Sequence, residues 1–422
     1  MNKIDVLLGL QWGDEGKGKI VDTLTPEYDI ITRFQGGPNA GHTLEFNGKK
    51  FILHTIPSGI FHDGKSNVIG NGVVLDPSVF KKEIDTLKKE VPDIAEKLCI
   101  SSKAHLILPT HRILDTAYEK AKGSSKIGST LKGIGPAYTD KTSRNGLRVG
   151  DILKENYKDL YDNHVKIHLD VLKNYDLEFS LSEYEEGWFE GIEEIQKFRI
   201  INSEYYINRQ LSDNKRILAE GAQGTMLDID FGSYPFVTSS NTVSAGACTG
   251  MGVSPRSIGE IFGIFKAYCT RVGSGPFPSE QENETGQKLR DQGFEYGSTT
   301  GRPRRTGWLD LPALKYSCMI NGVTRLFMTK ADVLSGFDKI RICTSYINNG
   351  EKTEEVPFDH NSIGEADYIE IKGWKEDISS IREYDKLPSS LKEYILIIEK
   401  ETGLPVTIVS VGPDRDQTIS RY

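Results

Sequence analysis

The segment Gly9-Leu-Gln-Trp-Gly-Asp-Glu-Gly-Lys-Gly-Lys19 follows the apolar run Ile4 to Leu8 and leads into Ile20-Val-Asp-Thr-Leu24. An apolar strand, a glycine-rich turn and the start of a helix, in that order, form a cradle for phosphate. The glycines let successive backbone N–H groups face the anion, and the helix N-terminus adds the positive end of its dipole. Lys17 and Lys19 can neutralise further charge. The segment therefore predicts a nucleotide-phosphate site, with an ordinary tight turn as the alternative.

The same segment departs from the P-loop pattern at one position. Gly13 and Gly18-Lys19 have the required spacing, but Ile20 stands where Ser or Thr would bind magnesium. Another oxygen must then hold the metal, and the carboxylates of Asp14 and Glu15 lie within the loop itself. An acid among phosphate-binding glycines is tolerable chiefly if it binds Mg²⁺ or accepts a proton.

Length and composition favour a single globular unit, residues 1–422, that acts on a small molecule. The chain is 37% hydrophobic and carries a net charge of −8, which argues against a general nucleic-acid binder. The basic cluster Arg302-Pro-Arg-Arg305 could still hold a small anion. The expected partner is a small phosphorylated molecule, with no nucleic acid and no membrane.

Cysteine usage and hydropathy predict a cytoplasmic location. The five cysteines are far apart and odd in number, so neither a disulfide framework nor a zinc knuckle is indicated. They are typical of small apolar residues in a reducing compartment. No stretch approaches the roughly 20 apolar residues of a membrane span.

Short apolar runs alternate with helical patterns, which predicts an α/β fold with a large mixed, mainly parallel sheet flanked by helices. A mostly helical insertion is expected at about 150–211. Ser182-x-x-Glu185 and Ser390-x-x-Glu393 have the spacing of capping boxes, and Gly403 should close the second helix. The expected strands are Asp5–Leu8, Ile30–Phe34, Phe51–Ile56, Asn67–Ile69, Ile217–Ala219, Ile261–Phe265, Arg325–Thr329, Ile340–Thr344 and Val406–Val411.

Glycine-rich polar turns recur after the expected strands. Phe34-Gln-Gly-Gly-Pro-Asn-Ala-Gly-His-Thr43 places His42 at the expected carboxyl edge of the sheet, where α/β folds bind ligands. Later turns are Ile127 to Tyr138, Glu220-Gly-Ala-Gln-Gly-Thr225 and Val237-Thr-Ser-Ser-Asn241. Gly297-Ser-Thr-Thr-Gly-Arg-Pro-Arg-Arg-Thr306 presents arginines from a glycine-hinged loop, which predicts an anionic substrate and a closing lid.

Two further segments receive no functional role. His164 and His168 are four residues apart on an expected helix, but the metalloprotease Glu and a third ligand are missing, so no metal is expected there. The charge-rich segment Ile369 to Lys386 is interpreted as a solvated surface anchored by Trp374.

Taken together, these motifs resemble the adenylosuccinate synthetase family, whose members are GTP-dependent ligases joining IMP and L-aspartate. The resemblance runs in register from Gly9 to Arg415. Besides the motifs above, it rests on Arg271-Val-Gly-Ser-Gly-Pro-Phe-Pro278, Thr329-Lys-Ala-Asp332 and Gly412-Pro-Asp-Arg415.

The resemblance implies a role for each matching residue. Asp14 would be the catalytic base and, with the Gly41 carbonyl, would bind Mg²⁺. His42, Lys17 and Gln223 would complete the catalytic set. GTP would contact Gly13, Glu15, Gly16, Lys17, Gly18, Lys19, Gly41, His42, Thr43, Arg304, Lys330, Ala331, Asp332, Ser410, Val411, Gly412 and Pro413. IMP would contact Asp14, Asn39, Ala40, Thr130, Arg144, Gln223, Thr238 and Arg302. Aspartate would contact Ser298, Thr299, Thr300, Gly301, Arg302, Pro303 and Arg304.

The resemblance further implies a phosphorylated IMP intermediate, a P-loop-like architecture and a homodimer in which Arg144 reaches the neighbouring active site. Pro38 and Pro303 depart from the family pattern, and Pro303 could stiffen the aspartate loop. A P-loop kinase is disfavoured by Ile20, and a non-catalytic nucleotide-binding regulator by Asp14 and His42. Both stay open as alternatives.

Overall fold

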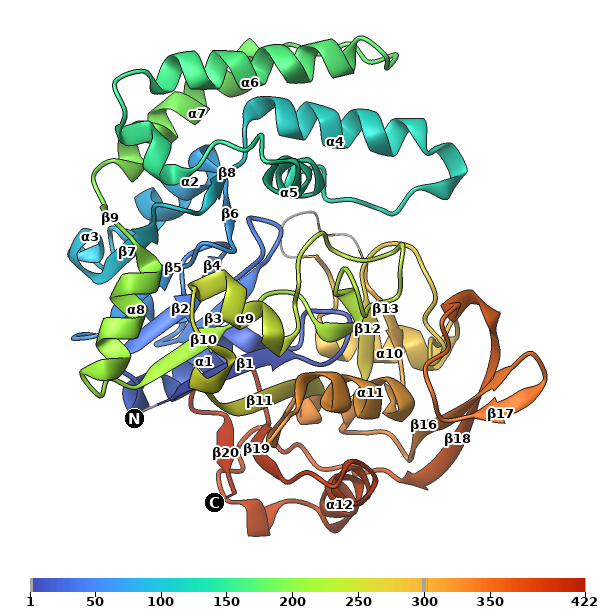
Figure 1. Ribbon diagram of the computed structural model, residues 1–422. Coiled ribbons are helices and arrows are strands. Elements are labelled where there is room, and N and C mark those ends of the chain that lie inside the picture. Colours follow the sequence, from blue (N-terminus) through green and yellow to red (C-terminus); the bar gives the residue numbers. More distant parts are fainter. Residues whose placement is uncertain (1–2, 298–300, 302, 422) are drawn as a thin grey trace.

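The computed structural model describes residues 3–297, 301 and 303–421. Its centre is a 10-stranded sheet in which every neighbouring pair is parallel except the last, antiparallel pair at one edge (Figure 1). The strands follow the order β20 (Thr418–Ser420), β19 (Val406–Ser410), β15 (Arg325–Thr329), β11 (Ile258–Lys266), β1 (Ile4–Gly9), β10 (Ile217–Glu220), β2 (Ile30–Arg33), β5 (Ser66–Ile69), β7 (Leu98–Ser101) and β9 (Arg199–Ile201).

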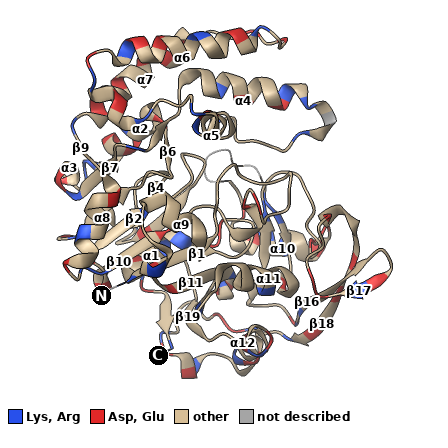
Figure 2. Cartoon of the chain, viewed as in Figure 1, with Lys and Arg blue, Asp and Glu red and all other residues tan. Residues whose placement is uncertain are grey.

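The helices connect and cover these strands. They are α1 (Lys17–Leu24), α2 (Pro77–Leu87), α3 (Ile94–Lys97), α4 (Pro109–Ala121), α5 (Ile134–Ser143), α6 (Tyr157–Leu172), α7 (Ser182–Ile195), α8 (Ser203–Ser212), α9 (Ser244–Met251), α10 (Glu284–Gly293), α11 (Leu311–Asn321) and α12 (Ser389–Thr402). Figure 1 shows α4 to α7 gathered at one end of the molecule and α11 and α12 towards the other. Basic and acidic residues are interspersed along α6, whereas the charged residues of α7 are all acidic, and both patterns are typical of a solvated surface (Figure 2).

The central strand β1 is buried on both faces, which explains its nearly continuous apolar sequence. Ile4, Val6 and Leu8 pack into the largest core cluster, while Leu7 points to the opposite face and packs with Ile20 of α1. Because successive side chains of β1 point to opposite faces of the sheet, the strand packs between two hydrophobic cores. One of these cores includes Ile20 and thereby holds α1 against the sheet.

The predicted α/β class with a mainly parallel sheet is confirmed, but two expected strands lie outside the central sheet. Phe51–Ile56 contributes to β4 (Lys49–Leu53), which forms a hairpin with β3 (His42–Phe46). Ile340–Thr344 lies in β16 (Lys339–Asn348), part of a 4-stranded sheet with β14 (Leu309–Asp310), β17 (Glu351–Thr353) and β18 (Ile363–Lys372). The remaining short strands are β6 (Val74–Leu75), β8 (His105–Leu106), β12 (Cys269–Arg271) and β13 (Arg305–Gly307).

The expected capping boxes are wrong, although the observed N-cap residues lie only one and two residues before the predicted serines, Ser182 and Ser390. Leu181 and Pro388 are the N-cap residues, and neither helix has a side-chain cap hydrogen bond. Gly403 does end α12 in the left-handed conformation, as predicted. All five cysteines are free, and none of the helices within the described ranges is long and apolar enough to cross a membrane.

Candidate functional site

Six neighbouring parallel strands, from β19 through β1 to β2, bring their carboxyl ends to one edge of the sheet. The glycine-rich turns found in the sequence follow these ends, so segments far apart in the chain meet there. A cavity of about 1430 Å³ opens at this edge. That volume exceeds the range typical of a single small ligand, so the cavity has room for more than one substrate.

Most of the expected site residues line this cavity. They are Gly13, Asp14, Gly16, Lys17, Gly18, Lys19, Asn39, Ala40, Gly41, His42, Thr43, Thr130, Gln223, Thr238, Arg304, Lys330, Asp332, Ser410, Gly412 and Pro413. Ala331 and Val411 are buried beside lining residues, while Gly301 and Pro303 are exposed. Ser298, Thr299, Thr300 and Arg302 lie outside the described residues.

The glycine-rich loop is built around the buried carboxylate of Glu15. Its Oε1 accepts hydrogen bonds from the backbone N–H groups of Gln11 (3.1 Å) and Gly13 (3.0 Å), and its Oε2 lies 2.5 Å from Lys17 Nζ. Gly13 and Gly16 both have φ of +88°, which favours glycine. The side chain of Glu15 therefore points into the loop and shapes it, while Asp14 and Lys17 line the cavity.

Lys19 connects the first helix to the C-terminal segment. Its Nζ donates to Ser410 Oγ (2.7 Å) and to the carbonyl oxygens of Gly412 (2.7 Å) and Gln417 (3.0 Å). Burial lowers the pKa of Lys19 to about 8. The ammonium group predicted to neutralise phosphate is thus already bound to three oxygens, and it positions the segment that begins at Ser410.

A buried cluster of charges lies beside Asp14. Arg304 Nε is 2.7 Å from Asp14 Oδ2, and Arg304 Nη1 is 2.8 Å from Glu295 Oε2. Glu295 also accepts from Lys266 Nζ (2.8 Å) and from the Tyr268 hydroxyl (2.5 Å). Burial lowers the pKa of Lys266 to about 8, although Glu295 counteracts part of that shift. The cluster holds Arg304 between two carboxylates at the cavity wall.

His42 is oriented by groups buried behind it. Its Nδ1 donates to the carboxylate of Glu220, which also accepts from the backbone N–H of Ser58 (2.8 Å) and the Ser58 hydroxyl (2.7 Å). Arg33 Nη1 lies 3.8 Å from Glu220 Oε1. Burial, followed by the nearby Arg33 charge, lowers the pKa of His42 to about 4. The ring is therefore neutral at pH 7, and its Nε2 is left as an acceptor.

Several buried polar atoms of cavity residues have no hydrogen-bond partner within the described part of the chain, among them His42 Nε2, Gln223 Oε1 and Asp332 Oδ1. The Gln223 side chain is fixed from its other end, because Nε2 donates to Asn39 Oδ1 at 3.2 Å. Burial raises the pKa of Asp332 above its ordinary value. Since unsatisfied buried polar atoms are costly, these three atoms indicate contacts made by bound ligand.

Sequence reasoning assigned no role to Glu220, Glu295 or Lys266, although each supports a cavity residue. Glu220 and Lys266 are the last residues of β10 and β11, so polar residues at strand ends were the available signal. Glu295 follows α10 in an irregular segment, so its position in the sequence did not indicate a role at the site.

Arg144 and His168 lie away from the cavity wall. Arg144 is exposed and follows Ser143, a lining residue, at the end of α5. His168 contacts Asp140 together with His111. His164 is not part of that cluster.

A parallel sheet that carries a phosphate loop beside a cavity of this size defines a nucleotide-dependent α/β enzyme. Comparison with known proteins makes the assignment specific. The family model for adenylosuccinate synthetase matches residues 6–419, so the chain belongs to the adenylosuccinate synthetase family and is a GTP-dependent ligase of purine nucleotide biosynthesis.

Similar proteins cover the chain from end to end. The adenylosuccinate synthetase of Parabacteroides distasonis is 60% identical over 420 residues, which are 100% of this chain and 99% of the relative. That of Bacteroides thetaiotaomicron is 59% identical with the same coverage. The structure of fully ligated adenylosuccinate synthetase from Plasmodium falciparum matches with a TM-score of 0.94 and 40% identity, covering 100% of both chains.

Proposed function

We propose that this chain joins IMP and L-aspartate in two steps within the one cavity. In the first step the 6-oxygen of IMP attacks the γ-phosphorus of GTP, and GDP leaves. In the second, the aspartate amine attacks C6 and phosphate leaves with the former 6-oxygen. The observation that carries this proposal is that the phosphate loop, Asp14, His42 and Gln223 line the same cavity.

Asp14 serves as the base in the first step. A lactam oxygen is a poor nucleophile until the neighbouring ring nitrogen loses its proton, so a carboxylate is needed beside the purine. The geometry supports this role, since Asp14 belongs to the phosphate loop and lines the cavity. The amide of Gln223, held by Asn39, contacts the 6-oxygen.

Charge that develops on the transferring phosphoryl group is stabilised by Lys17 and by His42 Nε2. Because His42 is neutral in the free chain, it donates to a phosphoryl oxygen only after gaining a proton. Mg²⁺ prefers oxygen ligands, and the Asp14 carboxylate and Gly41 carbonyl are suitable donors in the same cavity. When bound there, Mg²⁺ neutralises phosphate charge.

The other expected contacts divide by substrate. The guanine is held by Asp332, whose free oxygen accepts from the base, and by the segment from Ser410 to Pro413. IMP is held by Asn39, Ala40, Thr130 and Thr238, with Arg144 contributed across a homodimer. The segment 298–304 holds aspartate. Residues 1–422 form a single unit with an insertion at about 150–211, and the free cysteines fit a cytoplasmic enzyme.

Omitting each substrate in turn tests the proposed reaction. Phosphate should be released only when GTP, IMP, aspartate and Mg²⁺ are all present. Release without aspartate but with stoichiometric phosphorylation of an acceptor would indicate a kinase, and no release in any mixture would indicate a regulator. With IMP labelled by ¹⁸O at the 6-position, the label should appear in phosphate, and label in water would contradict a phosphorylated intermediate.

A further inference from the structure

One face of α4 carries three buried polar residues at successive helical turns: His111, Asp115 and Glu119. Residues four apart lie on the same side of a helix, so these side chains form a row. Burying two carboxylates and an imidazole is unfavourable unless each finds hydrogen-bond partners. Apart from the N–H of Leu108 and the ammonium group of Lys122, their partners belong to the segment from Gly128 to Asp140.

The two carboxylates hold the backbone of the loop before α5. Glu119 Oε2 accepts from the N–H groups of Gly128 (3.0 Å) and Ser129 (3.2 Å). Asp115 accepts from Ser129 Oγ (2.8 Å) through Oδ1 and from the N–H of Gly133 (2.9 Å) through Oδ2. The loop is therefore fixed on both sides of Thr130.

The histidine holds the helix that follows. His111 Nε2 and His168 Nε2 both lie 2.9 Å from Asp140 Oδ2, so one carboxylate of α5 joins α4 to α6. The Nδ1 of His111 accepts from the backbone N–H of Leu108 at 2.9 Å, which places the ring proton on Nε2. A metal at Nε2 would require loss of that proton as well, so the cluster is a hydrogen-bonded junction.

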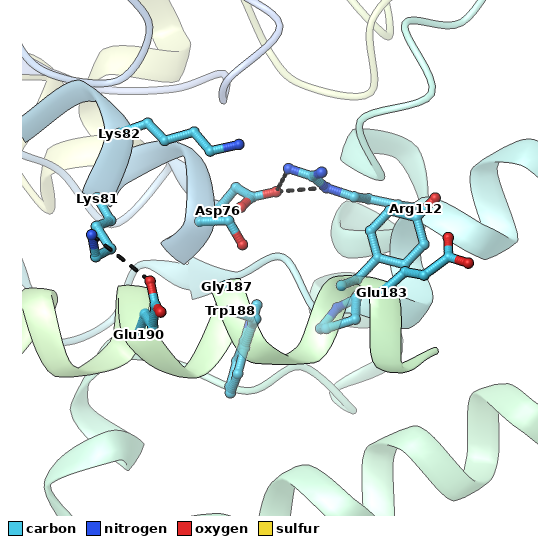
Figure 3. A pocket seen from close by; sticks show the side chains of 11 residues that line it. Asp76, Lys81, Lys82, Arg112, Glu183, Gly187, Trp188 and Glu190 are labelled. Carbon is cyan, nitrogen blue, oxygen red and sulfur yellow. Dashed lines mark hydrogen bonds and ion pairs between the residues drawn. The ribbon is translucent and has the colours of Figure 1, made fainter. Parts of the chain in front are cut away.

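The helix α4 is itself anchored on its other side. Arg112 Nε and Nη2 lie 2.9 and 2.5 Å from Asp76 Oδ2, in a small cavity beside α2 and α7 (Figure 3). Trp188 Nε1 donates to the carbonyl oxygen of Ile107, two residues before the helix, at 2.9 Å. The row on α4 therefore projects from a fixed support.

We infer that the α4 row of His111, Asp115 and Glu119 positions the segment 128–144 for IMP, setting Thr130 at the cavity wall and orienting the end of α5. Leu131 and Arg144 have φ of +55° and +67°, a conformation that non-glycine residues adopt at a cost, so the segment needs such support. The inference rests on the proposed IMP contacts of Thr130 and Arg144. His111, Asp115 and Glu119 are positioning residues.

Steady-state kinetics with each substrate varied separately tests this inference. Glu119→Ala removes the acceptor of two N–H groups, and the KM for IMP should rise about tenfold or more, the effect of losing one or two charge-assisted hydrogen bonds. The KM for GTP should stay within about twofold. Glu119→Gln keeps an oxygen that can accept both N–H groups and should restore the KM for IMP. Asp115→Asn, which keeps only one of two accepting oxygens, should fall between wild type and Asp115→Ala.

The matched control is Glu186→Ala, which removes an exposed glutamate from α7. Equal increases in the KM values for IMP and GTP, no rescue by glutamine, or an unchanged KM for IMP in folded Glu119→Ala would each overturn the inference. If wild type fails to release phosphate, the proposed function fails instead. Amide hydrogen exchange then decides the inference: faster exchange at 128–133 in Glu119→Ala but not in Glu119→Gln supports it, and equal exchange contradicts it.

Discussion

Arg304 Nε lies 2.7 Å from Asp14 Oδ2, so the guanidinium of the expected aspartate loop is paired with the expected catalytic base. The same guanidinium reaches Glu295, which is fully buried and already bound to Lys266. The contact with Glu295 can persist while the contact with Asp14 is exchanged for substrate. If Asp14 acts as the proposed base, we expect IMP to replace Arg304 as its partner.

Asp14→Asn should lower turnover by about 10³ or more, because the amide cannot accept the purine proton and is a weaker metal ligand. The fold should survive, since Asp14 is partly exposed at the cavity. Rapid-quench and steady-state assays measure the loss, with Asp213→Asn on the surface as control. Near-normal turnover in folded Asp14→Asn would remove this residue from the role of base.

GTP binding should be accompanied by proton uptake at His42. Burial and Arg33 hold its pKa at about 4 in the free chain, and a phosphate beside Nε2 favours the charged ring and raises that pKa. Proton uptake follows at any pH between the two values. Calorimetry in two buffers of different ionisation enthalpy measures the proton uptake as a difference in the observed enthalpy of GTP binding. The His42→Asn substitution should abolish that difference between the buffers. Identical proton uptake in wild type and His42→Asn would contradict this prediction.

Asp332→Asn should weaken GTP and improve XTP. A carboxylate accepts from both the ring N–H and the amino group of guanine, whereas an asparagine also offers a donor to the carbonyl of xanthine. Leaving paired acceptors unsatisfied costs up to about 10⁴ in discrimination. The ratio of kcat/KM for GTP and XTP measures the change. An unaltered ratio would move guanine recognition to another residue.

Mixing two inactive variants tests whether Arg144 serves the neighbouring subunit. Asp14→Asn and Arg144→Leu subunits, dissociated and allowed to re-form dimers, should regain about a quarter of wild-type activity. Half of the dimers are mixed under random pairing, and one site in each carries neither lesion. If Arg144 served its own subunit, every site would keep a lesion. Verified exchange without recovery would exclude the shared site.

The free energy of unfolding of Asp310→Asn, relative to that of wild type, should be higher at pH 8 than at pH 5. Burial raises the pKa of Asp310 to about 6, above its ordinary value of 3.8, so the folded chain holds this proton more tightly than the unfolded chain. Stability from Asp310 is thus greatest at low pH and is lost as the pH rises through 6. The lost contribution is about 1 to 2 kcal/mol between pH 5 and pH 8.

Melting temperatures of wild type and Asp310→Asn at both pH values test this. Asparagine can still accept from the N–H of Ala313 and the Tyr346 hydroxyl, which both use Oδ1. Any pH-independent cost of the substitution cancels in the difference between the two pH values. A difference in melting temperature that does not grow with pH would contradict a raised pKa at Asp310.

The sequence predicted the central sheet well where strands are continuous apolar runs followed by glycine, as at Ile4 to Gly9. It missed β9 because Arg199–Ile201 is too short to show a hydrophobic periodicity. It missed β18 because this strand has an exposed face and carries several charged residues. Pairing with β16 overrides local charge there.

The site was predicted through residues on glycine-rich turns. Its supports were harder to find, because Glu220 and Glu295 are buried acids whose partners, such as Ser58 and Lys266, come from distant segments. Spacing along the chain carries no information on such pairs. The sequence analysis likewise assigned no role to His111, Asp115 or Glu119, because their partners lie in a loop and a helix that follow α4.

The hydrogen bonds from Lys19 to Ser410 and Gly412 join the first helix to the last strand of the parallel sheet. During synthesis, the lysine of the phosphate loop leaves the ribosome 391 residues before Ser410, the first of the residues that bind it. The nascent chain therefore cannot complete the proposed GTP site until the segment from Ser410 to Gln417 has emerged. Truncated products would retain the phosphate-loop sequence without the ability to trap the nucleotide.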